Sequence, residues 1–222
     1  MLPGCRVVYN DFDRYVDRLA AVEQTNGILR AIKECLTGVE PNKRLSDRQC
    51  ADVLDIVHDH EKQNGYADIL TIGRSVLFSG KWAKSLDELR RHTMYNRVHS
   101  GDYRADGYLD GLEVVHLDYQ DLFDLHRDNP RVLFLIDPPY LTTECGMYKN
   151  YWKLTDHLNV LRLLKGTKYV YFTSDKSQIV ELCQWLADEY REAAPMWGAE
   201  IRQRTNTLNY QAKFNDMMIT RL

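Results

Sequence analysis

The sequence predicts an α/β fold built around a parallel β-sheet. Short apolar runs alternate with segments of helical periodicity that are ten or more residues long, a pattern typical of strands joined by helical crossovers. The run at residues 132–136 (Val-Leu-Phe-Leu-Ile) is apolar at every position. Such a strand is expected at the centre of a parallel sheet, with helices covering both of its faces. Residues 38–111 depart from this alternation and predict a mostly helical insertion.

The expected elements follow in order along the chain. A short strand at residues 6–9 ends before Asn10 and Asp11, and a helix then runs from about residue 14 to residue 36. Within the insertion, Ser46 and Ser85 each stand three residues before a Gln or Glu, so each predicts a capping box that opens a helix. Beyond the insertion we expect strands at 112–117, 132–136, 169–172 and 217–220, and helices at 120–126, 155–165 and 176–189.

Composition limits the classes of function. The chain has 222 residues, of which 44% are hydrophobic, and a formal charge of −3, so it lacks the overall basic character of a dedicated DNA-binding domain. No apolar run approaches the length of a membrane span, and no signal-peptide pattern is present, so we expect a cytoplasmic protein with no membrane association. The cysteines are scattered and never form a C-x-x-C pair, which predicts no metal site and mostly buried thiols; they are Cys5, Cys35, Cys50, Cys145 and Cys183.

The most informative motif is Asp137-Pro138-Pro139-Tyr140, which directly follows the apolar run at residues 132–136. The carboxyl ends of strands are where ligands bind in open α/β sheets. The two prolines stiffen the loop, and the Asp137 carboxylate and the Pro138 carbonyl can each accept one N–H of an amino group on a base. Tyr140 offers a flat face on which a base extruded from a duplex can stack. These four residues are the predicted catalytic residues.

With this motif, the chain resembles the Dam-type adenine-N6 DNA methyltransferases. Asn10-Asp11 resembles the segment whose aspartate holds the ribose hydroxyls of S-adenosylmethionine, and Asp118-Tyr119 resembles the acidic segment that contacts the adenine of this cofactor. The resemblance therefore implies Asp11, Asp118 and Tyr119 as cofactor-binding residues. It also implies a Rossmann-like class I methyltransferase sheet formed by residues 1–37 and 112–222, and a target-recognition insertion at residues 38–111. The substrate implied is adenine in double-stranded DNA, as in restriction–modification.

The chain departs from the family pattern at one point. The family carries a glycine-rich F-x-G-x-G loop after its first strand, and no glycines in this sequence are spaced as G-x-G. We therefore expect the sheet to be incomplete at its N-terminal strand. Strand edges and apolar surface would then be left uncovered, unless a homodimer or a separate N-terminal fragment covers them. S-adenosylmethionine would bind weakly to such a chain by itself.

Basic residues within the insertion are candidates for contact with DNA: Lys81, Lys84, Arg90, Arg91, Arg97 and Arg104. A solvated helix face is an equally good interpretation, because Asp87 and Glu88 lie among them. Three functions therefore stay open: an active methyltransferase, a non-catalytic member of the family, and a DNA-binding or interaction module that has lost the chemistry.

Overall fold

The computed structural model describes residues 4–78, 80–141, 152–207 and 213–222. The chain divides into two compact units, residues 1–116 and residues 117–222. This division differs from the boundary predicted at residues 37 and 38. That boundary separates functions, and it stays a prediction. No helix in the described part of the chain has the length and apolar character needed to cross a membrane.

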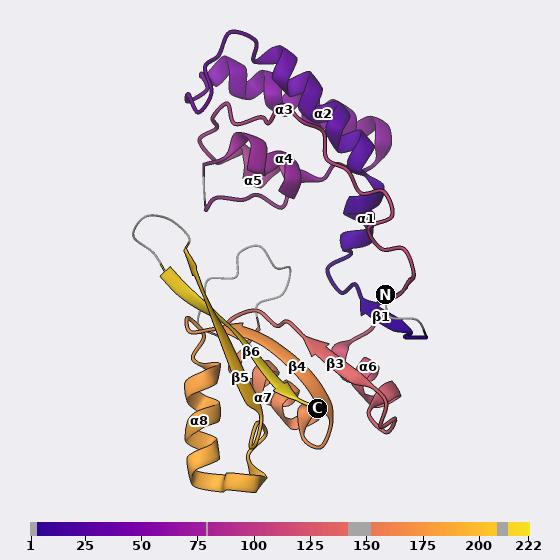
Figure 1. Cartoon of the computed structure of the whole chain (residues 1–222). Helices are drawn as coiled ribbons and strands as arrows, with labels where there is room; N and C mark the ends of the chain where they lie inside the picture. Colours follow the sequence, from indigo (N-terminus) through magenta and orange to yellow (C-terminus); the bar gives the residue numbers. More distant parts are fainter. Residues whose placement is uncertain (1–3, 79, 142–151, 208–212) are drawn as a thin grey trace. The chain divides into compact units, whose positions relative to one another are not determined.

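Unit 1 is mostly helical (Figure 1). Its helices are α1 (Tyr15–Ala20), α2 (Val22–Cys35), α3 (Asp47–Asn64), α4 (Ile69–Val76) and α5 (Leu86–Arg90). One apolar core joins α2 to the helices of the insertion, with Ile32, Val53 and Ile72 fully buried in it. Two short parallel strands, β1 (Val7–Asn10) and β2 (Leu112–Val115), complete the unit.

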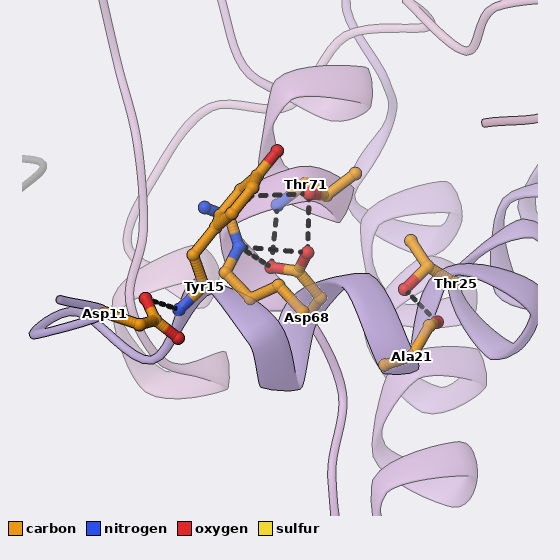
Figure 2. A network of polar contacts seen from close by, with 7 residues as sticks. Asp11, Tyr15, Ala21, Thr25, Asp68 and Thr71 are labelled. Atoms are coloured by element: carbon orange, nitrogen blue, oxygen red, sulfur yellow. Dashed lines mark hydrogen bonds and ion pairs between the residues drawn. The ribbon is translucent and has the colours of Figure 1, made fainter. Parts of the chain in front are cut away.

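The helix expected at residues 14–36 is two helices, with the break at Ala21. The Thr25 hydroxyl donates a hydrogen bond to the Ala21 carbonyl at 2.8 Å, as Figure 2 shows. The Thr25 backbone N–H donates to the same carbonyl at 2.8 Å, and a carbonyl shared in this way with a threonine hydroxyl often accompanies a bend in a helix. The apolar periodicity continues through the break, which is why the sequence pattern alone predicted one long helix.

A buried polar network joins α1 to α4 (Figure 2). Arg18 donates from Nε to both carboxylate oxygens of Asp68 at 3.2 Å and from Nη2 to the Thr71 hydroxyl at 3.0 Å. The Thr71 hydroxyl and backbone N–H in turn donate to Asp68 at 2.6 and 3.2 Å. Asp68 thereby caps α4 while it binds the cation of α1. The Arg18 guanidinium also lies 5.4 Å from the centre of the Tyr15 ring.

The two predicted capping boxes differ in the structure. At Ser46 the box is complete, because the Ser46 side chain accepts from the Gln49 N–H and the Gln49 side chain accepts from the Ser46 N–H. At Ser85 the hydroxyl accepts from the Glu88 N–H as predicted. The Glu88 carboxylate, however, accepts from the N–H of Lys84 at 2.8 Å. Both signals correctly located the start of a helix.

Unit 2 is a four-stranded sheet in the order β3-β4-β6-β5. Its strands are β3 (Leu133–Ile136), β4 (Lys168–Ser174), β5 (Glu200–Thr207) and β6 (Lys213–Arg221). The pair β3 and β4 is parallel, and β6 runs antiparallel to both β4 and β5. The helices are α6 (Tyr119–His126), α7 (Leu154–Leu164) and α8 (Ile179–Tyr190), followed by a 3-10 turn η1 (Arg191–Ala193). They share one apolar core with Phe134, Tyr169, Tyr171 and Ile219 of the sheet.

The prediction that residues 132–136 form a central strand covered on both faces is wrong for this unit. β3 lies at the edge of its sheet and pairs with β4 among the described residues. Phe134 is buried, but Leu133 and Leu135 on the opposite face are 44% and 65% exposed. An apolar sequence indicates a tendency to be covered, and no described residue of unit 2 covers this face of β3.

Two further expectations need correction. Strand β5 was not predicted, because the sequence Glu-Ile-Arg-Gln-Arg-Thr-Asn-Thr has no apolar alternation; it forms a strand because β6 supplies its backbone hydrogen bonds. The cysteines are not mostly buried either. Among the described ones Cys183 is buried, Cys50 is half-buried, and Cys5 and Cys35 are exposed, while Cys145 lies outside the described residues.

Candidate functional site

The Asp137–Tyr140 motif lies where the sequence predicted it, at the carboxyl end of β3. The loop is anchored to the segment that follows the neighbouring strand β4. The Leu141 N–H donates to the Ser177 hydroxyl at 3.1 Å, and the Tyr140 hydroxyl is hydrogen-bonded to Ser174, the last residue of β4. Pro138 is buried, so the middle of the motif is packed while both of its polar ends retain solvent access. The loop therefore presents a carboxylate and a phenol from a backbone that is held in place.

The electrostatic surroundings of the motif are negative. Loss of hydration on burial raises the pKa of the Asp137 carboxyl, and the nearby Asp216 carboxylate raises it further. Burial also raises the pKa of the Tyr140 hydroxyl, and the hydrogen bond with Ser174 partly offsets this effect. A site of this kind favours groups that donate N–H bonds or carry positive charge. An aromatic amino group that becomes cationic as it reacts has both properties.

Asp216 was not identified from the sequence. It stands in β6 opposite Ser174 of β4, and the Asn206 side-chain amide donates to its carboxylate. Neither residue belongs to a recognisable motif, and they are ten positions apart in the chain. Only the pairing of β5 with β6 brings Asn206 and Asp216 together, near the end of the sheet where β4 ends.

The predicted cofactor residues of unit 2 lie at the start of α6. Asp118 caps this helix by accepting the Gln120 N–H at 2.8 Å, and it remains exposed. The Tyr119 ring lies 5.4 Å from the Trp152 ring at an angle of 32°, so one of its faces is already engaged in packing. The accessible Asp118 carboxylate is chemically suited to accept a hydrogen bond from the amino group of an adenine ring.

The third predicted cofactor residue, Asp11, forms hydrogen bonds that stabilise the start of α1. It is 1% exposed, and one of its carboxylate oxygens accepts the backbone N–H of Tyr15 at 2.6 Å, as Figure 2 shows. The other carboxylate oxygen accepts the backbone N–H of Val16 at 2.8 Å. Asp11 thereby satisfies two of the free N–H groups at the start of α1. As it stands, the carboxylate is not accessible to the hydroxyls of a ribose. Its role in cofactor binding stays a prediction.

The six basic residues predicted to contact DNA are in different local environments. Arg90 forms an exposed ion pair with Asp87 at 3.2 Å. Arg97 is half-buried, donates to the Leu77 carbonyl at 2.8 Å, and stacks 5.6 Å from the Phe78 ring, so it has a structural role in unit 1. The other four residues are exposed; they are Lys81, Lys84, Arg91 and Arg104.

His157 on α7 is the most unusual buried group of unit 2. It is 1% exposed, its ring is 5.3 Å from that of Trp152, and neither ring nitrogen has a hydrogen-bond partner among the described residues. Burial lowers the pKa of His157 from its ordinary value of 6.5, while Asp156 acts weakly in the opposite direction. The fold therefore favours the neutral imidazole.

We expect His157→Phe to be tolerated and to remove part of the acid sensitivity of the protein. Because the pKa of His157 is lower in the folded chain, the unfolded chain takes up the proton first, so stability is lost as the pH falls below 6.5. The phenyl ring conserves the packing and removes two buried nitrogens that have no hydrogen-bond partner among the described residues, so at pH 7.5 the variant should be about 1–3 kcal/mol more stable. Urea unfolding of both proteins at pH 7.5 and pH 5.5 measures this. Equal losses of stability on acidification would contradict the assignment.

Comparison with known proteins adds the following. No family model matches the chain. Over 190 residues the chain is 34% identical to a Haemophilus influenzae protein named "Putative methyltransferase". This similarity supports a methyltransferase family for the chain. The match covers 84% of this chain and 63% of the relative, so the chain spans less than two thirds of the length of the protein that it matches.

Proposed function

We propose that the chain is an S-adenosylmethionine-dependent DNA methyltransferase that acts on the N6 amino group of adenine. The proposal depends on one observation above all: Asp137-Pro138-Pro139-Tyr140 stands at the carboxyl end of β3, anchored to Ser174 and Ser177. The related methyltransferase supports the general reaction class. The mixed α/β architecture is compatible with the Rossmann-like sheet that the resemblance implies.

The chain's own residues would act through hydrogen bonding and charge. The amino nitrogen of adenine is a poor nucleophile, because its lone pair is delocalised into the ring. The Asp137 carboxylate and the Pro138 carbonyl would each accept one of its N–H groups, and so stabilise the positive charge that develops on nitrogen. Tyr140 would stack on the extruded base. S-adenosylmethionine would supply the methyl group, with Asp118 and Tyr119 as the candidates to hold its adenine.

The same proposal assigns different roles to different segments of the chain. Residues 1–37 and 112–222 would carry the chemistry, and residues 38–111 would recognise double-stranded DNA. The exposed cations Lys81, Arg91 and Arg104 are the candidates for contact with phosphates. A second polypeptide, either another copy or a separate N-terminal segment, would cover the exposed Leu133 and Leu135 beside the edge of β3 that pairs with no other described strand.

The second candidate is a non-catalytic homologue or DNA-binding module that needs a separately supplied segment. One observation favours it, namely that the Asp11 carboxylate is buried and occupied by backbone N–H groups. Transfer of a labelled methyl group from S-adenosylmethionine to unmethylated duplex DNA distinguishes the two. The methyltransferase proposal expects N6-methyladenine in the product. DNA binding without any transfer would reject it in favour of the second candidate.

A further inference from the structure

Asp216 lies in the first part of β6, between two strands that end at the same edge of the sheet. The strand register places it opposite Ser174 of β4 on one side and opposite Arg204 of β5 on the other. It is half-buried, and the Asn206 side chain donates a hydrogen bond to one of its oxygens. The carboxylate is therefore held in one place by the sheet and by a neutral donor.

The register, together with the contact between Ser174 and Tyr140, links Asp216 to the Asp-Pro-Pro-Tyr loop. Ile136 at the end of β3 is level with Tyr171 of β4, so Asp137 follows at the end of the strand adjacent to the one that carries Ser174. Ser174 is hydrogen-bonded to the Tyr140 hydroxyl and stands opposite Asp216. The negative charge of Asp216 acts on both ends of the loop, raising the pKa of Asp137 and that of Tyr140.

On the basis of the proposed function, we propose that Asp216 is a positioning residue for Asp137, holding a second negative charge beside it so that the carboxylate pair takes up the proton that the methylated amino group loses. S-adenosylmethionine would supply the methyl group, and as the new N–C bond forms the electron pair of the methyl–sulfur bond would remain on sulfur. The nitrogen then carries a positive charge and two protons. One N–H bond breaks, its electron pair returns to nitrogen, and the proton passes to the carboxylate pair and then to water.

Two carboxylates are better suited to this task than one. A second negative charge strengthens the attraction for the cationic nitrogen, and it makes the first carboxylate a stronger base. No cation is hydrogen-bonded to Asp216 among the described contacts, since its partner Asn206 is neutral. Among the described residues, the other titratable or charged groups around the pair are Tyr140, Tyr171, Asp175, Lys176 and Arg204.

The test compares Asp216→Asn with Asp188→Asn in the full chain. The asparagine at 216 has nearly the shape of the aspartate and retains an acceptor for Asn206. Asp188 is an exposed residue of α8, so its substitution makes the same change of charge away from the site. Carbon-13 NMR of the Asp137 carboxyl group gives its pKa in each protein, whether or not the protein methylates DNA. The rate of methyl transfer across pH gives the functional readout.

We expect Asp216→Asn to lower the pKa of Asp137 and to move the acid limb of the pH–rate profile to lower pH. We also expect kcat/KM at neutral pH to fall by about tenfold, because a weaker base accepts the proton less well. Asp188→Asn should change neither quantity. An unchanged pKa of Asp137 in Asp216→Asn would overturn the proposal. If the pKa falls but the wild-type chain transfers no methyl group, the proposed function is wrong, and with it the proton-accepting role of the pair.

Discussion

Asp137→Ala should strongly reduce methyl transfer while leaving the protein folded. The substitution removes the carboxylate that would accept one amino N–H, and a preorganised electrostatic contact of this kind contributes about 100- to 1000-fold to a reaction rate. Folding should not suffer, because the Asp137 carboxylate retains solvent access although it is partly desolvated, and the anchors of the loop are the contacts of Tyr140 and Leu141 with the β4–α8 segment. Incorporation of labelled methyl groups into unmethylated duplex DNA measures the rate.

Two further variants make the result specific. Asp137→Asn keeps an oxygen that accepts the N–H but loses the charge, so its activity should fall between those of wild type and Asp137→Ala. Asp188→Ala removes an exposed carboxylate of α8 and should behave as wild type. Circular dichroism verifies that all variants are folded. An Asp137→Ala protein that retains most of the wild-type rate would exclude the motif as the catalytic centre.

Arg18→Ala should destabilise unit 1 by about 2–3 kcal/mol. Removing one partner of a buried ion pair costs about 3–5 kcal/mol, because it leaves the other charge uncompensated. The expected value is lower here, since the Arg18 side chain is 28% exposed and Asp68 keeps its hydrogen bonds from Thr71. Asp68 itself is only 6% exposed, so water cannot readily replace the lost guanidinium. Urea unfolding followed by circular dichroism gives the change in the free energy of unfolding.

The matched control is Arg14→Ala in the same segment of the chain. Arg14 pairs with Asp17 at 2.7 Å, which is shorter than the 3.2 Å between Arg18 and Asp68. The pair is nevertheless exposed, with side-chain exposures of 64% and 46%, so its loss should cost less than about 1 kcal/mol. The loss of stability should therefore be larger for the buried pair than for the exposed pair, although the N–O distance is shorter in the exposed pair. Equal losses for the two variants would show that the Arg18–Asp68 network contributes little to stability.

The local signals in the sequence predicted most of the elements. The Ser46 box located the start of α3, and apolar periodicity located α6 and α7 to within a residue or two. Such signals depend on contacts between residues three or four positions apart, which are present in any helix. These local signals could not predict the polar strand β5, because the contacts that stabilise it come from β6.

What the sequence determined by itself is the Asp137-Pro138-Pro139-Tyr140 loop and its place after a strand. Its residue types provide hydrogen-bond acceptors for an amino group, and the apolar run before it predicts a strand that ends just before Asp137. Only the tertiary structure decided what surrounds that loop. It brought Asp216 and Asn206 to the edge of the sheet, committed the Asp11 carboxylate to the start of α1, and left Leu133 and Leu135 of β3 exposed. The physical reason is that charge, burial and hydrogen-bond satisfaction at a site depend on which distant segments pack there, and the order of residues within one segment does not contain that information.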